Sequence, residues 1–141
     1  MMNIEVKKLI PEAVLPTYAN EHDAGMDLYA SKTVTIPAHE RALIPTGIAM
    51  AIPEGNVGLI WDKSGLATKH GLTCLAGVID AGYRGEVIVA VYNTSNKEYI
   101  AEAGKKIAQL LVQPVVHGNI TEVKELSDSM RGEKGFGSSG V

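Results

Sequence analysis

The chain has 141 residues, of which 45% are apolar and 21% are charged, and its formal net charge is −3. This length suits one folded domain, and the composition excludes a disordered chain and a membrane span of about 18 apolar residues. The single cysteine, Cys74, excludes an internal disulfide, and the slightly acidic balance does not favour a nucleic-acid partner.

Short segments rich in Val, Ile and Thr, separated by turn residues, predict a chain built of β-strands. In chain order the expected strands are residues 3–10, 34–37, 41–52, 57–61, 86–93, 108–114 and 120–126. The pattern of residues 86–93 indicates burial on much of both faces, whereas residues 120–126 suit an edge strand. Many short strands with turns between them favour a sandwich, a jelly roll or a barrel.

Helical periodicity is weak except at residues 64–71, which can form about two turns. Ser64 would be the N-cap of this helix and Gly71 its C-cap. The predicted fold is therefore all-β: a distorted, jelly-roll-like barrel or sandwich with one short helix. Residues 1–126 would form this β domain.

Residues 127–141 differ from the rest because they hold four glycines and little that could pack in a core. We expect a flexible C-terminal arm. The single phenylalanine of the chain, Phe136, lies in this arm beside donors such as Arg131 and Ser138. Composition alone leaves two interpretations open, a disordered end and an arm that closes on a ligand.

Residues 77–86 (GVIDAGYRGE) form the most unusual polar cluster, with three glycines that predict a tight hairpin with positive φ angles. Asp80 follows an apolar run, so its carboxylate would emerge beside the core. It could cap the backbone of a turn. It could equally act as a general base that orients and deprotonates a water. The pattern alone does not separate these two roles.

Other polar segments are less specific. Ser64 and Gly65 could bind phosphate or simply begin a helix. The Gly25–Asp27 segment reads as a turn, and Lys105 and Lys106 read as solvated residues at a hairpin tip. The four histidines show no metal-ligand spacing, and no Walker A loop or dinucleotide motif is present.

Taken together, five segments resemble the five ordered motifs of the homotrimeric dUTP pyrophosphatases (dUTPases). They are residues 24–30 (AGMDLYA), 63–66 (KSGL), 77–86, 104–110 (GKKIAQL) and 131–140 (RGEKGFGSSG). One such motif would be weak support, but five in order across most of the chain are specific.

The resemblance implies hydrolysis of dUTP to dUMP and pyrophosphate, which limits uracil incorporation into DNA and supplies dUMP for dTMP synthesis. Asp80 would activate the water that attacks the α-phosphorus. Tyr83 would pack against the deoxyribose and leave no room for a 2′-hydroxyl. The backbone of Gly77, Val78 and Ile79, which leads to Asp80, would contact the uracil.

The resemblance also implies a phosphate side of the site. Ser64 and the Gly65 N–H would hold phosphate oxygens, with Lys63 and Gln109 beside them. Mg²⁺ would be carried mainly on the triphosphate, and Asp27 would support the metal's shell of water molecules indirectly.

In the resembled family the arm closes over the nucleotide. Phe136 would stack on the uracil, Arg131 would meet phosphate, and Gly137, Ser138 and Ser139 would hold the γ-phosphate. The implied assembly is a homotrimer with active sites shared between subunits, with no nucleic acid or membrane partner. We expect a cytoplasmic location, or the nucleus or host cytosol for a eukaryotic or viral source, and no secretion.

The second motif departs from the family pattern, because Asp62-Lys63 replaces the usual Pro-Arg. Lysine keeps the charge but lacks the two-pronged contact of arginine, and Asp62 adds a negative charge near the expected phosphates.

Two alternative functions remain. A dCTP deaminase of the same fold needs a glutamate that is absent from residues 87–91 and an arginine that is absent from residues 66–69. A non-catalytic nucleotide- or protein-binding module is the other.

Overall fold

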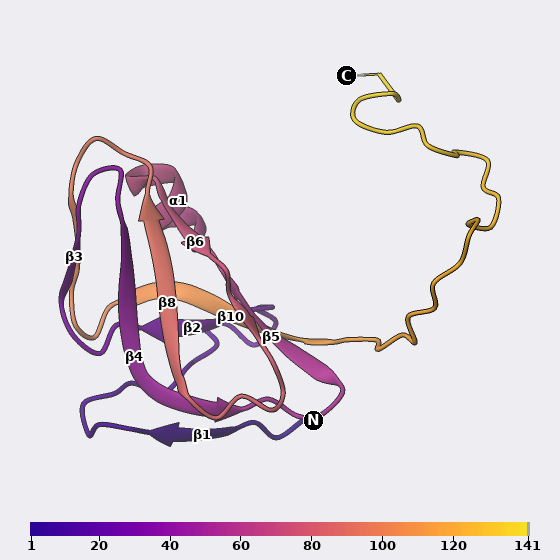
Figure 1. The fold of residues 1–141 in the computed structure, drawn as a ribbon. Helices are drawn as coiled ribbons and strands as arrows, with labels where there is room; N and C mark the ends of the chain where they lie inside the picture. The colour runs from indigo at the N-terminus through magenta and orange to yellow at the C-terminus, as the bar shows by residue number, and fades with distance from the viewer. Residues whose placement is uncertain (141) are drawn as a thin grey trace.

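The computed structural model describes residues 1–140. Within them it contains ten strands and one short helix (Figure 1). In chain order the elements are β1 Glu5–Lys8, β2 Met26–Tyr29, β3 Val34–Ile36, β4 Arg41–Ala51, β5 Asn56–Trp61, α1 Ser64–His70, β6 Leu72–Leu75, β7 Val78–Ile79, β8 Glu86–Asn93, β9 Tyr99–Ala101 and β10 Lys106–Pro114.

The strands form two four-stranded antiparallel sheets and a small two-stranded one. The first sheet has the order β1-β4-β8-β6, the second β2-β10-β5-β7, and β3 pairs with β9. Figure 1 shows β2 and β10 running across behind β4 and β8. The predicted all-β, jelly-roll-like architecture with one short helix is confirmed.

The core lies on the inner faces of the two large sheets. Alternate residues of β8, Val87, Val89 and Val91, are buried together with Leu28 of β2 and Leu110 of β10. The period-2 pattern of a strand causes this alternation. The prediction that residues 86–93 are buried on much of both faces holds fully for the inner face only. On the outer face Ile88 is 44% exposed, and Glu86, Ala90 and Tyr92 are partly buried within this chain.

The helix α1 ends as predicted and begins differently. Gly71 is the C-cap, with a left-handed φ of 68°, and its N–H bonds to the carbonyl of Ala67 at 3.0 Å. Ser64 is the first helical residue, and Lys63 is the N-cap without a side-chain capping bond. The predicted N-cap role of Ser64 is therefore wrong by one residue. No helix in residues 1–140 has the length and apolar character to cross a membrane.

One predicted strand is wrong and four real strands were missed. Residues 120–126 form no strand, and Ile120, Val123 and Leu126 are exposed. A β-strand needs a neighbouring strand to complete its ladder of hydrogen bonds, and none of the described strands pairs with this segment. The missed strands β2, β6, β7 and β9 have two to four residues each, too few for the period-2 signal to stand out.

The C-terminal segment leaves the body of the protein just after β10. Val115 N–H donates to the Gly55 carbonyl at 3.0 Å, and the backbone hydrogen bonds described beyond it lie within the segment itself. Figure 1 shows the segment, orange to yellow, running away from the sheets.

Candidate active site

Asp80 follows directly on the short strand β7. This strand is anchored because Ile79 is buried and pairs with Gly58 of β5. The Asp80 side chain is exposed, and its backbone carbonyl accepts the Tyr83 N–H at 3.0 Å, which closes a tight turn. A fixed strand thus ends in a carboxylate that is open to solvent.

A cavity of about 210 Å³ lies beside this carboxylate. Its wall is made by residues 77–80, Tyr83 and residues 86–88, with Ile60 behind them. Much of that wall is apolar side chain and turn backbone, so the cavity suits a flat, partly apolar group whose polar edge meets backbone N–H and C=O groups.

Tyr83 occupies its place because Gly85 has no side chain. The Tyr83 hydroxyl donates to the Glu86 carbonyl at 2.8 Å. A Cβ atom on Gly85 would lie 2.5 Å from the Tyr83 hydroxyl oxygen and 2.6 Å from its ring carbon Cζ. The glycine therefore lets the ring lie across the turn and line the cavity.

The hairpin predicted for residues 77–86 is wrong in its pairing. β7 pairs with β5 in one sheet, whereas β8 pairs with β4 and β6 in the other. Of the three glycines only Gly77 has a positive φ, 101°, and a Cβ there would approach the Ile60 carbonyl oxygen at 3.0 Å. The segment is a corner that carries the chain between sheets, and Gly77 is where it turns.

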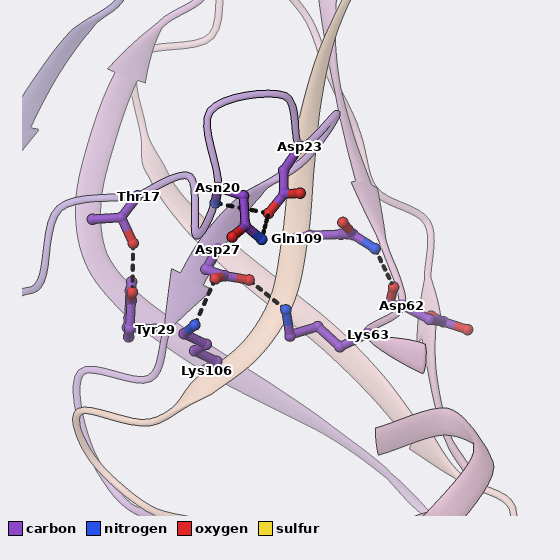
Figure 2. Close-up of polar contacts among 9 residues, drawn as sticks. All are labelled: Thr17, Asn20, Asp23, Asp27, Tyr29, Asp62, Lys63, Lys106 and Gln109. Atoms are coloured by element: carbon purple, nitrogen blue, oxygen red, sulfur yellow. Dashed lines mark hydrogen bonds and ion pairs between the residues drawn. The ribbon is translucent and has the colours of Figure 1, made fainter. Parts of the chain in front are cut away.

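A second polar cluster surrounds Asp27 on β2 (Figure 2). Asp27 is only 3% exposed, although its side chain is a carboxylate. Oδ1 pairs with the Lys63 ammonium and Oδ2 with the Lys106 ammonium at 2.8 Å. Burial alone would raise the pKa of Asp27, but the two ammonium groups outweigh burial and hold this pKa below its ordinary value.

Sequence reasoning missed the role of Lys106. This residue begins β10, opposite Tyr29 of β2 in the sheet, which brings its ammonium group to Asp27. It was expected to be solvated at a hairpin tip. The pairing of β10 with β2 is the signal that would have revealed the contact of Lys106 with Asp27. That pairing could not be predicted, because β2 itself was not predicted.

Gln109 and Asp62 connect three strands near this cluster. The Gln109 side-chain amide donates to the Asp62 carbonyl at 2.8 Å (Figure 2). The Asp62 carboxylate accepts the Thr73 hydroxyl at 2.7 Å and the Cys74 N–H at 2.5 Å. Burial raises the pKa of the Cys74 thiol to about 12, and the hydrogen bond and charge of Asp62 add to this effect.

A cavity of about 300 Å³ brings the first, second and fourth motifs together. Asp27, Lys63, Ser64, Lys106 and Gln109 border it, with residues 23–25 and Ala19. Gly65 follows Ser64, and a Cβ atom there would meet open space. Two lysines, a hydroxyl and an amide supply the donors that a phosphate group requires, and the carboxylates of Asp23 and Asp27 border the same cavity.

The arm residues are placed apart from both cavities. Phe136 is fully exposed, and the Arg131 Nε donates to the Lys134 carbonyl at 2.6 Å within the arm itself. Gly137, Ser138 and Ser139 follow in the same exposed segment. One chain therefore presents the predicted site residues in three separate places: the cavity at Asp80, the cavity at Asp27, and the arm.

Comparison with known proteins identifies the family. The dUTPase family model matches residues 11–140. The chain belongs to the dUTPase family. The deoxyuridine 5′-triphosphate nucleotidohydrolase of Clostridioides difficile is 47% identical over 142 residues, covering 99% of each chain. That of Paramecium bursaria Chlorella virus 1 is 43% identical and covers 100% of each chain.

Solved dUTPase structures have the same fold. The dUTPase of Staphylococcus bacteriophage 80alpha with dUpNHpp is 34% identical, covers 100% of both chains, and superimposes with a TM-score of 0.94. A point variant of the dUTPase from phage phi11 of S. aureus is described with a structural Mg(II) ion. It is 29% identical with a TM-score of 0.82, and the match covers 88% of this chain and 98% of that one.

The structure explains the unusual second motif of this dUTPase. Lys63 contacts Asp27, whereas the Asp62 carboxylate is directed to Thr73 and Cys74 of β6. The negative charge that was expected to disturb phosphates is thus satisfied by two donors on another strand.

Proposed function

We propose that this protein hydrolyses dUTP to dUMP and pyrophosphate. The water oxygen attacks the α-phosphorus, the bond from that phosphorus to the bridging oxygen breaks, and pyrophosphate leaves. The cavity beside Asp80 carries the proposal, because it combines an anchored, exposed carboxylate with a tyrosine that restricts the space around a sugar. The relatives named as deoxyuridine 5′-triphosphate nucleotidohydrolases support the same reaction.

In this proposal Asp80 is the general base that orients the attacking water and takes its proton. Uracil occupies the cavity against the backbone of Gly77, Val78 and Ile79. Tyr83 lies against the deoxyribose, and its ring fills the space that a 2′-hydroxyl would need. This arrangement is supported by the backbone-rich wall of the cavity and by Gly85, which leaves the ring its place.

The phosphates lie at the second cavity, where Ser64, Gly65, Lys63 and Gln109 hold their oxygens. Phosphoryl transfer needs positioning and charge neutralisation more than covalent help. The Asp27 carboxylate fixes Lys63 at the border of this cavity, so that one ammonium group is oriented before substrate arrives.

Mg²⁺ enters the proposal as part of the substrate, bound to the triphosphate. The described residues include no group of three or more His, Cys, Asp or Glu side chains that could hold an ion. Both carboxylate oxygens of Asp27 face ammonium groups. These residues do not fit a resident metal site. The predicted support of the metal's water shell by Asp27 stays a prediction, and it requires a lysine to release the carboxylate first.

We propose a homotrimer in which each active site combines parts of different subunits. The support is the separation of the site residues into two cavities and an arm that does not reach either cavity of its own chain. Residues 127–141 would close over the nucleotide held by other subunits. Phe136 stacks on uracil, Arg131 meets phosphate, and Gly137, Ser138 and Ser139 bind the γ-phosphate. Closure would exclude bulk water while one attacking water remains.

The deaminase alternative is not favoured. Glu86 is the acid on β8 that lines the cavity, and its carboxylate accepts the Gly47 N–H at 2.9 Å, so that it is bound to the bend of β4.

Purified protein with Mg²⁺ and dUTP should release pyrophosphate and dUMP in equal amounts, and its mass should be that of a trimer. Deoxyuridine products from dCTP would favour deamination, and a folded trimer that releases no pyrophosphate would favour a binding module.

A further inference from the structure

Asp62 links the two large sheets at the junction between β5 and α1. Its carboxylate accepts the Thr73 hydroxyl at 2.7 Å and the Cys74 N–H at 2.5 Å, both on β6. Its backbone carbonyl accepts the Gln109 amide of β10 at 2.8 Å. Because β6 and β10 belong to different sheets, a single residue holds the junction against both.

The residues next to Asp62 are those that border the proposed phosphate cavity. Only Asp62 and Lys63 separate β5 from α1, and Ser64 follows at once. Lys63, Ser64 and Gln109 border the cavity of about 300 Å³. Any movement of the Asp62 backbone therefore moves Lys63 and Ser64 directly, and it moves Gln109 through the hydrogen bond at its amide.

The carboxylate itself faces away from that cavity. Asp62 borders a different cavity of about 270 Å³, together with Thr73 and Cys74. Two donors of β6 bind its two oxygens, one each. Its charge is thus directed to β6 and away from Lys63, Ser64 and Gln109, the groups proposed to bind phosphate.

Gln109 is held on its second side as well. A Cβ atom on Gly25 would collide with the Gln109 Oε1 and lie 3.0 Å from its Cδ, so the amide packs directly on the glycine backbone. With Nε2 bound to Asp62, both ends of this amide are fixed.

We propose that Asp62 is a positioning residue for the phosphate side of the active site. Its hydrogen bonds to β6 hold the junction so that Lys63, Ser64 and Gln109 face one triphosphate together. This inference rests on the proposed function, in which that cavity binds the phosphates. It predicts that loss of these bonds weakens binding of a triphosphate and leaves binding of a monophosphate nucleotide unchanged.

The test compares Asp62→Ala with Asp62→Asn by calorimetry, using Mg²⁺ with non-hydrolysable dUpNHpp and, separately, dUMP. Asp62→Ala removes both bonds to β6, and we expect about tenfold weaker dUpNHpp binding, with dUMP affinity unchanged. Asparagine has the same shape: its oxygen can accept the Cys74 N–H, and its amide can donate to the Thr73 hydroxyl. Asp62→Asn should therefore stay within about threefold of the wild type.

Three results would overturn the inference. In the first, Asp62→Ala weakens the binding of dUpNHpp and of dUMP equally. In the second, it changes the affinity for neither. In the third, Asp62→Asn loses as much dUpNHpp affinity as Asp62→Ala, which would mean that the negative charge of Asp62, and not its hydrogen bonds, is what matters. If Asp62→Ala does not fold, Thr73→Val decides, with about threefold weaker dUpNHpp binding expected and an unchanged affinity overturning the inference. Thr35→Val, at an exposed position of β3, is the matched control. Absence of dUTP hydrolysis by the wild type refutes the proposed function separately, because these binding measurements need no turnover.

Discussion

The cavity beside Asp80 and the cavity beside Asp27 are built in different ways. The first is walled mainly by one stretch of chain, β7, the turn after it and the start of β8, with one exposed carboxylate and an aromatic ring. The second is assembled from side chains of β2, the β5–α1 junction and β10, which are far apart in the chain. Its Asp27 carboxylate is buried and paired with two lysines.

This difference shows how one protein can bind the base and the phosphates of a nucleotide by different means. Backbone groups of a turn are fixed by the fold and suit the edge of a base, which is neutral. Charged phosphates need ammonium groups and amides, and these long side chains need partners that hold them in place.

Asp80→Asn should abolish nearly all turnover, with a loss of about 10³-fold or more in kcat, on the scale of a lost general base. Asparagine keeps the shape of the side chain but cannot take the proton from water. Binding of dUpNHpp should stay close to wild type, because the side chain is exposed and the fold loses only a charge. A full rate of pyrophosphate release from this variant would exclude Asp80 as the base.

Removal of residues 131–141 should lower kcat/KM by about 10²-fold, the scale of losing a set of preorganised donors. The proposed trimer should persist, since the arm makes no described backbone hydrogen bond to the sheets beyond Val115. Phe136→Ala alone should give a smaller loss in the same assay. An unchanged rate in the truncated protein would reject closure of the arm.

Tyr83→Ala should relax the discrimination between dUTP and UTP by about tenfold, because a smaller side chain opens space for the 2′-hydroxyl. Tyr83→Phe is the control, because it keeps the ring and loses only the bond to the Glu86 carbonyl. Gly85→Ala should displace the ring and shift the ratio in the same direction. Competition between the two nucleotides in one assay gives the ratio, and a ratio equal to that of the wild type would reject the proposed role.

The turn-built cavity was the part more open to prediction from sequence. Residues 77–83 are contiguous, and the apolar run before Asp80 indicated that its carboxylate emerges beside the core, which buried Ile79 bears out although the predicted pairing was wrong. Strand β8 and the Gly71 cap were found because their signals are local, a period of two and a glycine after a helix. The strand predicted at residues 120–126 is wrong because the pattern of one segment does not indicate whether a partner strand exists.

The side-chain-built cavity could be predicted only in outline. Its residues were matched to motifs, but the pairing of Asp27 with Lys63 and Lys106 depends on which strands lie side by side. Residues 25–27 read as a turn, so β2 and its register against β10 were missed. Likewise, Asp62 looked like an unfavourable charge until the position of β6 showed its two donors.

Asp27→Ala should affect only the cavity that is built from side chains. Without the carboxylate, the ammonium groups of Lys63 and Lys106 repel each other and lose a partner, while the turn-built cavity is untouched. We expect Tm to fall by about 3–6 °C, the scale of one lost interaction in a domain of this size. Glu21→Ala, at an exposed position of the preceding loop, is the matched control and should leave Tm unchanged. The affinity for dUMP should also stay constant, because the proposed function places the uracil and sugar at the other cavity. A loss of dUMP affinity equal to that for dUpNHpp would mean that the two cavities are one structural unit.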